Sequence, residues 1–203
     1  MIAFFLKGLA IGFSIAAPVG PIGVLCIRRT LSDGRMAGLV SGLGAATADA
    51  LYGCIAGFGL TLVSAFLLDQ QAWIHLVGGV FLCYLGLKTF FSKPAGQTAN
   101  VQGGNLLSAY FSTLILTLTN PLTILSFAAI FAGLGLGAAG GDFSSAGVLV
   151  TGVFVGSAGW WLLLSGGVSL FRQRFDQRAM GWVNKFSGLI ILGFGLAAFW
   201  RLT

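Results

Sequence analysis

The stretch Ala17-Pro18-Val19-Gly20-Pro21 interrupts the first long apolar run of this chain. Two prolines and a glycine so close together normally mark a turn. The flanking segments, "FFLKGLAIGFSIA" before the break and "IGVLCI" after it, have instead the composition of a membrane helix. A break there is costly, because lipid offers no partners to the backbone groups that it frees. The sequence therefore predicts that the break faces protein or a water-filled cavity.

The composition indicates a membrane protein. The chain has 203 residues, of which 57% are hydrophobic and 8% charged, and its mean hydropathy is +0.95. About a quarter of the residues of a soluble domain are charged. The apolar runs are continuous rather than alternating, which favours helices over a β-barrel. We therefore predict an all-α polytopic membrane protein with a single transmembrane domain over residues 1–203. Its net charge of +6 is spread over loop ends and does not indicate nucleic acid.

Six spans are predicted, at about residues 2–27, 36–68, 73–91, 106–134, 144–171 and 183–202. Basic residues gather in the first, third and fifth loops. By the positive-inside rule these loops face the cytoplasm, so both termini are expected outside. The loop bases are Arg28, Arg29, Arg35, Lys88, Lys93, Arg172, Arg174 and Arg178, with Lys185 just beyond.

The two halves of the chain, about residues 1–95 and 104–203, resemble each other. "PIGVL" begins at Pro21 and "PLTIL" at Pro121, and aligning Gly79 with Gly188 also aligns Gly86 with Gly195. Three helices per half invert the second half relative to the first. The sequence therefore predicts two inverted three-helix repeats with proline-broken helices 1 and 4. Paired breaks of this kind point to a transport site near the membrane midplane.

The residues of the breaks, Pro18, Gly20, Pro21 and Pro121, are candidate site residues. Proline removes a helix hydrogen bond, so carbonyls near residues 14–17 and 117–120 are free to bind a substrate ammonium or a coupling cation. The half-helix after Pro21 or Pro121 would direct its positive end at an anion such as a carboxylate. The alternative interpretation is that both prolines only kink their helices for packing.

Asp49 is the acid placed deepest in the predicted membrane region, within "GLGAATADALYG". An aspartate at the centre of a membrane helix costs about 3 kcal/mol on insertion scales. It is therefore a candidate proton carrier, cation ligand or counter-charge to a substrate amine. A structural hydrogen bond to a neighbouring hydroxyl is the alternative.

Three polar or aromatic side chains complete the candidate site. Asn120 precedes Pro121 and can both donate and accept hydrogen bonds. Thr123 is a weaker candidate, because hydroxyls often bond back to their own helix. Trp160 lies in the middle of the fifth span beside Trp161 and could line a cavity or stack on a cation, although packing explains it equally well. No metal site or cofactor is predicted. Glycine pairs such as Gly152/Gly156 fit either internal packing or a dimer seam.

The break around Gly20-Pro21, the segment "RRTLSDGRMAGLVSGLGAATAD" and the motif "TNPLTIL" resemble the LysE/RhtB amino-acid exporters. The resemblance covers the whole chain, and Gly20-Pro21 and Asn120-Pro121 are its most specific parts. It implies efflux of amino acids across the bacterial inner membrane, driven by a proton gradient or the membrane potential. Asp49 matches an acidic position of the lysine-exporting branch. Residues 122–126 lack that branch's further acid, which disfavours a dibasic substrate, and Pro18 departs from the commonest pattern.

Other functions fit the sequence less well. An intramembrane enzyme needs paired carboxylates, an HExxH motif or a Ser/His pair at depth. The chain has no glutamate and a single histidine, so we expect no enzyme. A transporter of another small cation or metal in the same fold, or a non-transporting membrane scaffold, stays open as an alternative.

Overall fold

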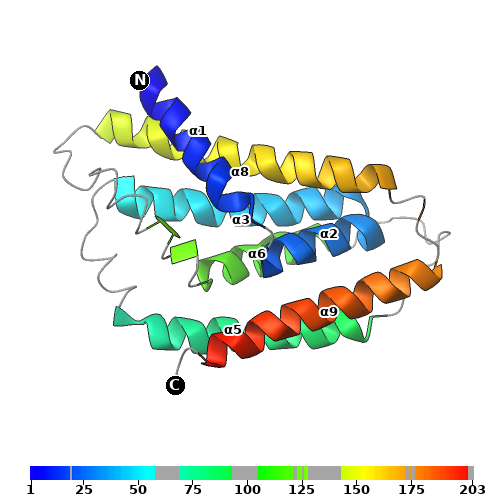
Figure 1. Ribbon diagram of the computed structural model, residues 1–203. Helices are drawn as coiled ribbons and strands as arrows, with labels where there is room; N and C mark the ends of the chain where they lie inside the picture. The colour runs from blue at the N-terminus through cyan, green and yellow to red at the C-terminus, as the bar shows by residue number, and fades with distance from the viewer. Residues whose placement is uncertain are drawn as a thin grey trace.

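The fold consists of helices over the part of the chain that the computed structural model describes: residues 1–18, 20–57, 69–92, 105–120, 123–124, 126–127, 143–171, 174 and 177–200. Most of the helices run along one common direction, and α1 crosses them at an angle (Figure 1). The helices are α1 (Ile2–Ala16), α2 (Pro21–Asp33), α3 (Arg35–Gly57), α5 (Gln71–Phe90), α6 (Leu106–Leu118), α8 (Phe143–Phe171) and α9 (Gln177–Trp200).

Three of these helices are long and apolar enough to cross a membrane, namely the segments Arg35–Ile55, Ser144–Phe171 and Arg178–Phe199. The pair α1 and α2 makes a fourth span if it is counted as one broken crossing, and α5 and α6 contain shorter apolar helices. Helical structure in the predicted spans is therefore confirmed, whereas the number of six crossings stays a prediction. Residues 58–68 of the second predicted span, and residues 121–122, 125 and 128–134 of the fourth, lie outside the described residues, and Pro121 is among them.

The first predicted span is divided into α1 and α2, whose axes differ by 80°. Helix α1 ends at Ala16, and Ala17 still has helical backbone angles (φ −64°, ψ −37°) and donates its N–H to Phe13 O. The helical hydrogen bonds stop at the next residue, because Pro18 has no N–H. Helix α2 begins with Pro21 at its first position, where the missing N–H removes no helical bond. The predicted end at residue 27 is wrong, since α2 continues to Asp33. It stops at Gly34, whose φ of 102° suits glycine, and α3 follows at once.

Glycines allow α1 and α8 to pack backbone against backbone. A Cβ atom added at Gly8 or Gly12 would overlap the main chain of α8, and one at Gly152 or Gly156 would overlap the main chain of α1. Small residues permit this close approach between helices. The pair Gly152/Gly156 therefore serves internal packing in this chain.

Two apolar clusters form the core of the described part of the chain, and α3 takes part in both. One contains Ala45 and Ala46 of α3, and the other contains Tyr52. Asp49 lies between them along the helix and is 3% exposed. The sequence thus places a carboxyl group at the junction of two hydrophobic clusters, where solvent cannot hydrate it freely.

Candidate functional site

A cavity of about 380 Å³ lies where the break between α1 and α2 meets α3, α6, α8 and α9. The residues that line it come from both halves of the chain, and they combine backbone at a helix break with one carboxyl group. They are Ser14, Ile15, Ala16, Pro18, Gly20, Pro21, Ile22, Gly23, Ala45, Asp49, Thr117, Asn120, Thr123, Ser126, Trp161 and Phe194.

The broken helix gives this cavity backbone groups of both kinds. In a continuous helix the carbonyl of Ser14 would accept the N–H of residue 18, but Pro18 has none. At the other side of the break, α2 begins at Pro21, so Ile22 and Gly23 lie in its first turn and line the cavity. The first N–H groups of a helix have no partner within it and carry the positive end of its dipole. One wall of the cavity therefore suits a cation and the neighbouring wall suits an anion.

Asp49 lies on the α3 side of the cavity and is held by a relay of two side chains from α8. The Ser157 hydroxyl donates to Asp49 Oδ2 over 2.7 Å, and Trp161 Nε1 donates to Ser157 Oγ over 3.2 Å. Within the described part of the chain, Ser157 is the hydrogen-bond partner of this carboxyl group. An ionised carboxylate can accept about four hydrogen bonds, so Asp49 keeps capacity for a solute.

The end of α6 forms the opposite wall. Thr117 in the last turn of α6 lines the cavity there, together with Asn120 and Thr123, which follow the last helical residue Leu118. The Thr117 hydroxyl bonds back to Thr113 O over 2.8 Å, and Asn120 O accepts the N–H of Thr123 over 3.1 Å. The hydroxyl of Tyr52 in α3 donates to Leu118 O, which satisfies a carbonyl at the helix end. The end of α6 is thus partly capped, by Tyr52 of α3 and by hydrogen bonds within its own segment.

Six of the eight predicted site residues line this one cavity. They are Pro18, Gly20, Pro21, Asp49, Asn120 and Thr123. Pro121 lies outside the described residues. Trp160 is half-buried and makes an edge contact with Phe13, at 5.3 Å between ring centres, whereas its neighbour Trp161 lines the cavity. Sequence reasoning did not select Ser157, although its spacing of four residues before Trp161 places both on one face of a helix.

Arg28 and Arg29 have roles that the sequence analysis missed by assigning them to a loop. The Arg29 guanidinium donates to Ser41 Oγ of α3 at 2.8 Å and to Thr113 Oγ1 of α6 at 2.9 Å. It also donates to two further groups of α6, Ala109 O at 3.0 Å and Ser112 Oγ at 2.8 Å. Arg29 therefore ties α2 to α3 and α6.

Arg28 makes a second tie, between α2 and α9. Its Nε donates to Asn184 Oδ1 over 3.1 Å, and Asn184 Nδ2 donates to Ser92 O, just after α5, over 3.2 Å. Asn184 is 1% exposed, so its amide is a buried structural link rather than a surface cap.

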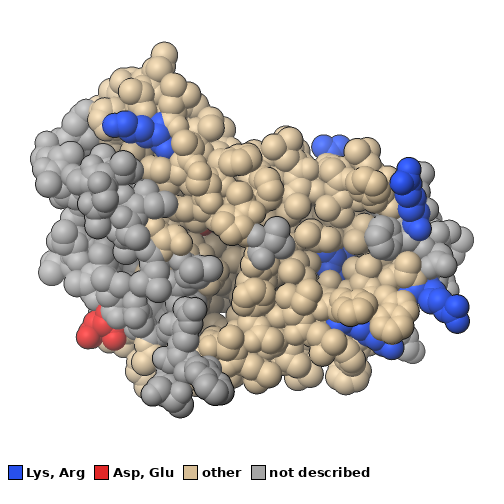
Figure 2. All heavy atoms as spheres, viewed as in Figure 1, with Lys and Arg blue, Asp and Glu red and all other residues tan. Residues whose placement is uncertain are grey.

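Positive charge is concentrated at one end of the molecule. Figure 2 shows most of the visible Lys and Arg side chains at the end where α2 finishes and α9 begins, and a single cationic patch at the other end, where α1 starts. The first residue of α1 and the last of α9 both lie at this second end (Figure 1). Within the described residues, no group of three His, Cys, Asp or Glu side chains could hold a metal ion.

The family model described as "LysE type translocator" matches residues 13–201. The chain belongs to the LysE family. Among curated relatives in the comparison, YcgF of Bacillus subtilis (strain 168), whose name assigns it provisionally to amino acid efflux, is 27% identical over 94% of this chain and 92% of its own length. The "Threonine efflux protein" of Escherichia coli (strain K12) is 24% identical over 97% of both chains. No solved structure matches this member of the LysE family.

Proposed function

We propose that this chain is a secondary transporter, not an enzyme, and that it exports amino acids from the bacterial cytoplasm through the central cavity. One observation carries the proposal: a buried carboxyl group and the positive end of a helix line the same cavity. A zwitterion can present its ammonium to the carboxyl group and its carboxylate to the positive end of the helix. The family and the efflux names of two relatives support the same class of solute.

In the proposed complex, the substrate ammonium faces Asp49 and the carbonyls of the break, and its carboxylate faces the first turn of α2. The cavity of about 380 Å³ is at the small end of the range for ligand pockets, about 300–1,000 Å³. This size favours a single small amino acid over a peptide. Asn120 and Thr123 from the second half supply further polar contacts, and Trp161 forms an aromatic wall beside the ammonium.

We further propose that the domain consists of two inverted three-helix repeats. The contact between α5 and α9 supports this arrangement: Gly79 approaches Gly195, and Gly86 approaches Gly188. These are the pairs that a pseudo-twofold axis generates if residue 79 corresponds to 188 and residue 86 to 195. The same symmetry would make the contact between α8 and α1 equivalent to the contact between α3 and α6. In agreement with this, Gly156 of α8 packs on α1 and Gly44 of α3 packs on α6.

The orientation and energy coupling belong to the same proposal. The cation-rich end would face the cytoplasm, which leaves both termini outside. Asp49 would release its proton when a substrate ammonium arrives and take up another when the substrate has left on the outer side. Such exchange at one carboxyl group couples export to the proton gradient.

The experiment is export from cells that overexpress the chain and are loaded with dipeptides, beginning with those that release threonine. We expect one or a few amino acids to leave faster than from control cells. Asp49→Asn should abolish the difference, because it removes the counter-charge. Asp69→Asn is the matched control, since Asp69 is an exposed acid outside the cavity.

Correct membrane insertion is checked by labelling single cysteines introduced at each end. If the inserted wild-type chain exports none of the amino acids, the proposed substrate class is wrong. If Asp49→Asn exports as fast as the wild type, the proposed role of the carboxyl group is wrong, whatever the substrate.

A further inference from the structure

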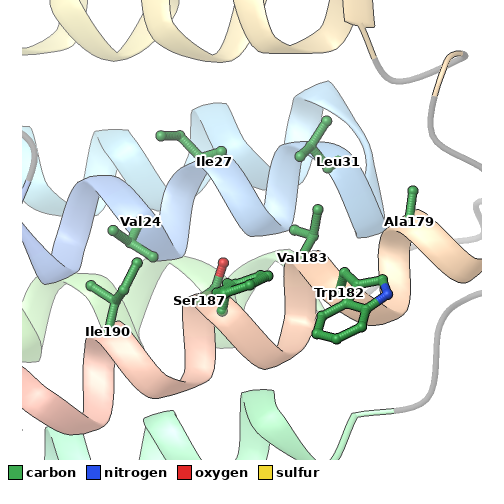
Figure 3. A pocket seen from close by; sticks show the side chains of 9 residues that line it. Val24, Ile27, Leu31, Ala179, Trp182, Val183, Ser187 and Ile190 are labelled. Carbon is green, nitrogen blue, oxygen red and sulfur yellow. The ribbon is translucent and has the colours of Figure 1, made fainter.

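A second hollow lies between α2 and α9, apart from the central cavity. It has a volume of about 530 Å³ and opens to the outside of the bundle, since Trp182, Phe186 and Ile190 on its wall are 56%, 58% and 45% exposed. In Figure 3, Val24 of α2 lies opposite Ile190 of α9, and Leu31 of α2 lies opposite Val183 of α9. The side chains that line the hollow are Val24, Ile27, Leu31, Ala179, Trp182, Val183, Phe186, Ser187 and Ile190, and only the serine is polar.

Cationic side chains stand at one end of this groove. Lys185 Nζ lies 5.5 Å from the ring centre of Trp182, which lines the groove. Arg178 is exposed in the first turn of α9 and precedes the lining residue Ala179. Lysine and arginine commonly extend from apolar surface to the membrane interface in this way. The groove thus combines an apolar body with a cationic end at the cation-rich side of the molecule.

This combination matches an anionic phospholipid, which has apolar chains and a negative head group. We propose that the groove between α2 and α9 binds one such lipid, with an acyl chain against Ile27 and Val183 and its phosphate beside Arg178 and Lys185. A neutral lipid would fill the apolar part equally well but would gain nothing from the two cations. The proposal stands independently of the transported solute.

The lipid would lie close to the moving part of the proposed transporter. Ile190 of the groove and Phe194 of the central cavity are one helical turn apart on α9, as are Val24 and Gly20 on the α2 side. An acyl chain in the groove would therefore pack against α2 within one helical turn of the break that lines the central cavity.

The test uses the full chain reconstituted in vesicles of equal phosphatidylcholine and phosphatidylglycerol, extracted gently and analysed by native mass spectrometry. We expect one retained phosphatidylglycerol per chain. Substituting both Arg178→Gln and Lys185→Gln should lower the preference for phosphatidylglycerol over phosphatidylcholine, by about fivefold for each cation removed. Val183→Trp should fill the groove and abolish retention of either lipid.

Two matched controls keep the result specific. Lys88 stands over Tyr84 on α5 as Lys185 stands over Trp182, but neither Lys88 nor Tyr84 lines the groove between α2 and α9, so Lys88→Gln should leave retention unchanged. Leu189→Trp adds a ring on α9 outside the groove and should also have no effect. Equal retention of both lipids by the wild type would overturn the proposal. So would unchanged retention in Val183→Trp, or a lipid-free dimer of chains that buries the groove.

Discussion

Arg29 and Asp49 both bring charge into the helix bundle, but their surroundings differ. Arg29 donates four hydrogen bonds to groups of α3 and α6. Asp49 accepts one, from Ser157, and faces a cavity. A charge whose bonding capacity is largely filled holds helices together, whereas a charge with capacity left beside a cavity is available to a solute. The comparison therefore predicts that Arg29 contributes to stability, and it supports the proposed role of Asp49 in transport.

The largest expected effect is on stability, from Arg29→Met. The substitution removes the four hydrogen bonds by which the Arg29 guanidinium ties α2 to α3 and α6. Hydrogen bonds to charged groups contribute about 1.5–3 kcal/mol each. We expect the unfolding temperature of the purified protein in detergent to fall by more than about 5 °C. Circular dichroism at 222 nm during heating would measure it.

The control for this substitution is Arg35→Met, because Arg35 is exposed at the start of α3. Its unfolding temperature should stay close to that of the wild type. Equal unfolding temperatures for Arg29→Met and the wild type would contradict the proposed role of Arg29 in stabilising the helix bundle.

Asp49→Asn should show the opposite pattern, with transport lost and stability kept. Asparagine is nearly isosteric and its carbonyl oxygen can still accept from Ser157, so the fold does not need the charge. Loss of the counter-charge should slow amino acid export at least about tenfold, which corresponds to about 1.4 kcal/mol. The rate of export from cells that express the variant tests the loss of transport. The unfolding temperature of the variant purified from the same cells tests the retention of stability. A strongly destabilised Asp49→Asn would make this carboxyl group a structural element like Arg29.

The sequence predicted the apolar helices well because hydropathy alone defines them. The third and fifth predicted spans, 73–91 and 144–171, agree with α5 (Gln71–Phe90) and α8 (Phe143–Phe171) to within about two residues. The break at Pro18 and Pro21 was also predictable, since proline acts through its own covalent structure. What one residue does to its own helix can therefore be inferred without knowing its neighbours.

The errors arose where a distant partner decides the outcome. Arg28 and Arg29 were assigned to a loop because polar residues usually end a span, but partners in α3, α6 and α9 let α2 continue past them. Helix α9 likewise begins at Gln177 rather than near residue 183, because a polar first turn precedes its apolar part. Hydropathy records the polarity of a side chain and carries no information about the group that will satisfy it.

A smaller effect is expected from Ser157→Ala, which removes the donor to Asp49 without touching its charge. The carboxyl group keeps its charge and loses only one positioning hydrogen bond, so we expect export to fall about fivefold, which corresponds to about 1 kcal/mol. Ser165→Ala is the control on the same helix, because the Ser165 hydroxyl is buried and bonds back to Trp161 O over 2.7 Å. Export by the Ser165 variant should match the wild type. If both variants export equally, Ser157 does not position the carboxyl group.

The smallest effect distinguishes the two adjacent tryptophans. Successive residues of a helix point about 100° apart, and α8 is apolar on all sides, so its sequence did not indicate which ring faces the cavity. Trp161→Phe keeps most of the aromatic wall but loses the Nε1 donor to Ser157. We expect export to fall about twofold to threefold, because this hydrogen bond acts on Asp49 only through Ser157. Trp160→Phe keeps its ring contact with Phe13 and should leave export unchanged. Initial rates of threonine release from dipeptide-loaded cells, normalised to the amount of inserted protein, resolve a difference of this size. A larger loss for Trp160→Phe than for Trp161→Phe would mean that the solute meets α8 on its other face, and the relay from Trp161 through Ser157 to Asp49 would then be packing alone.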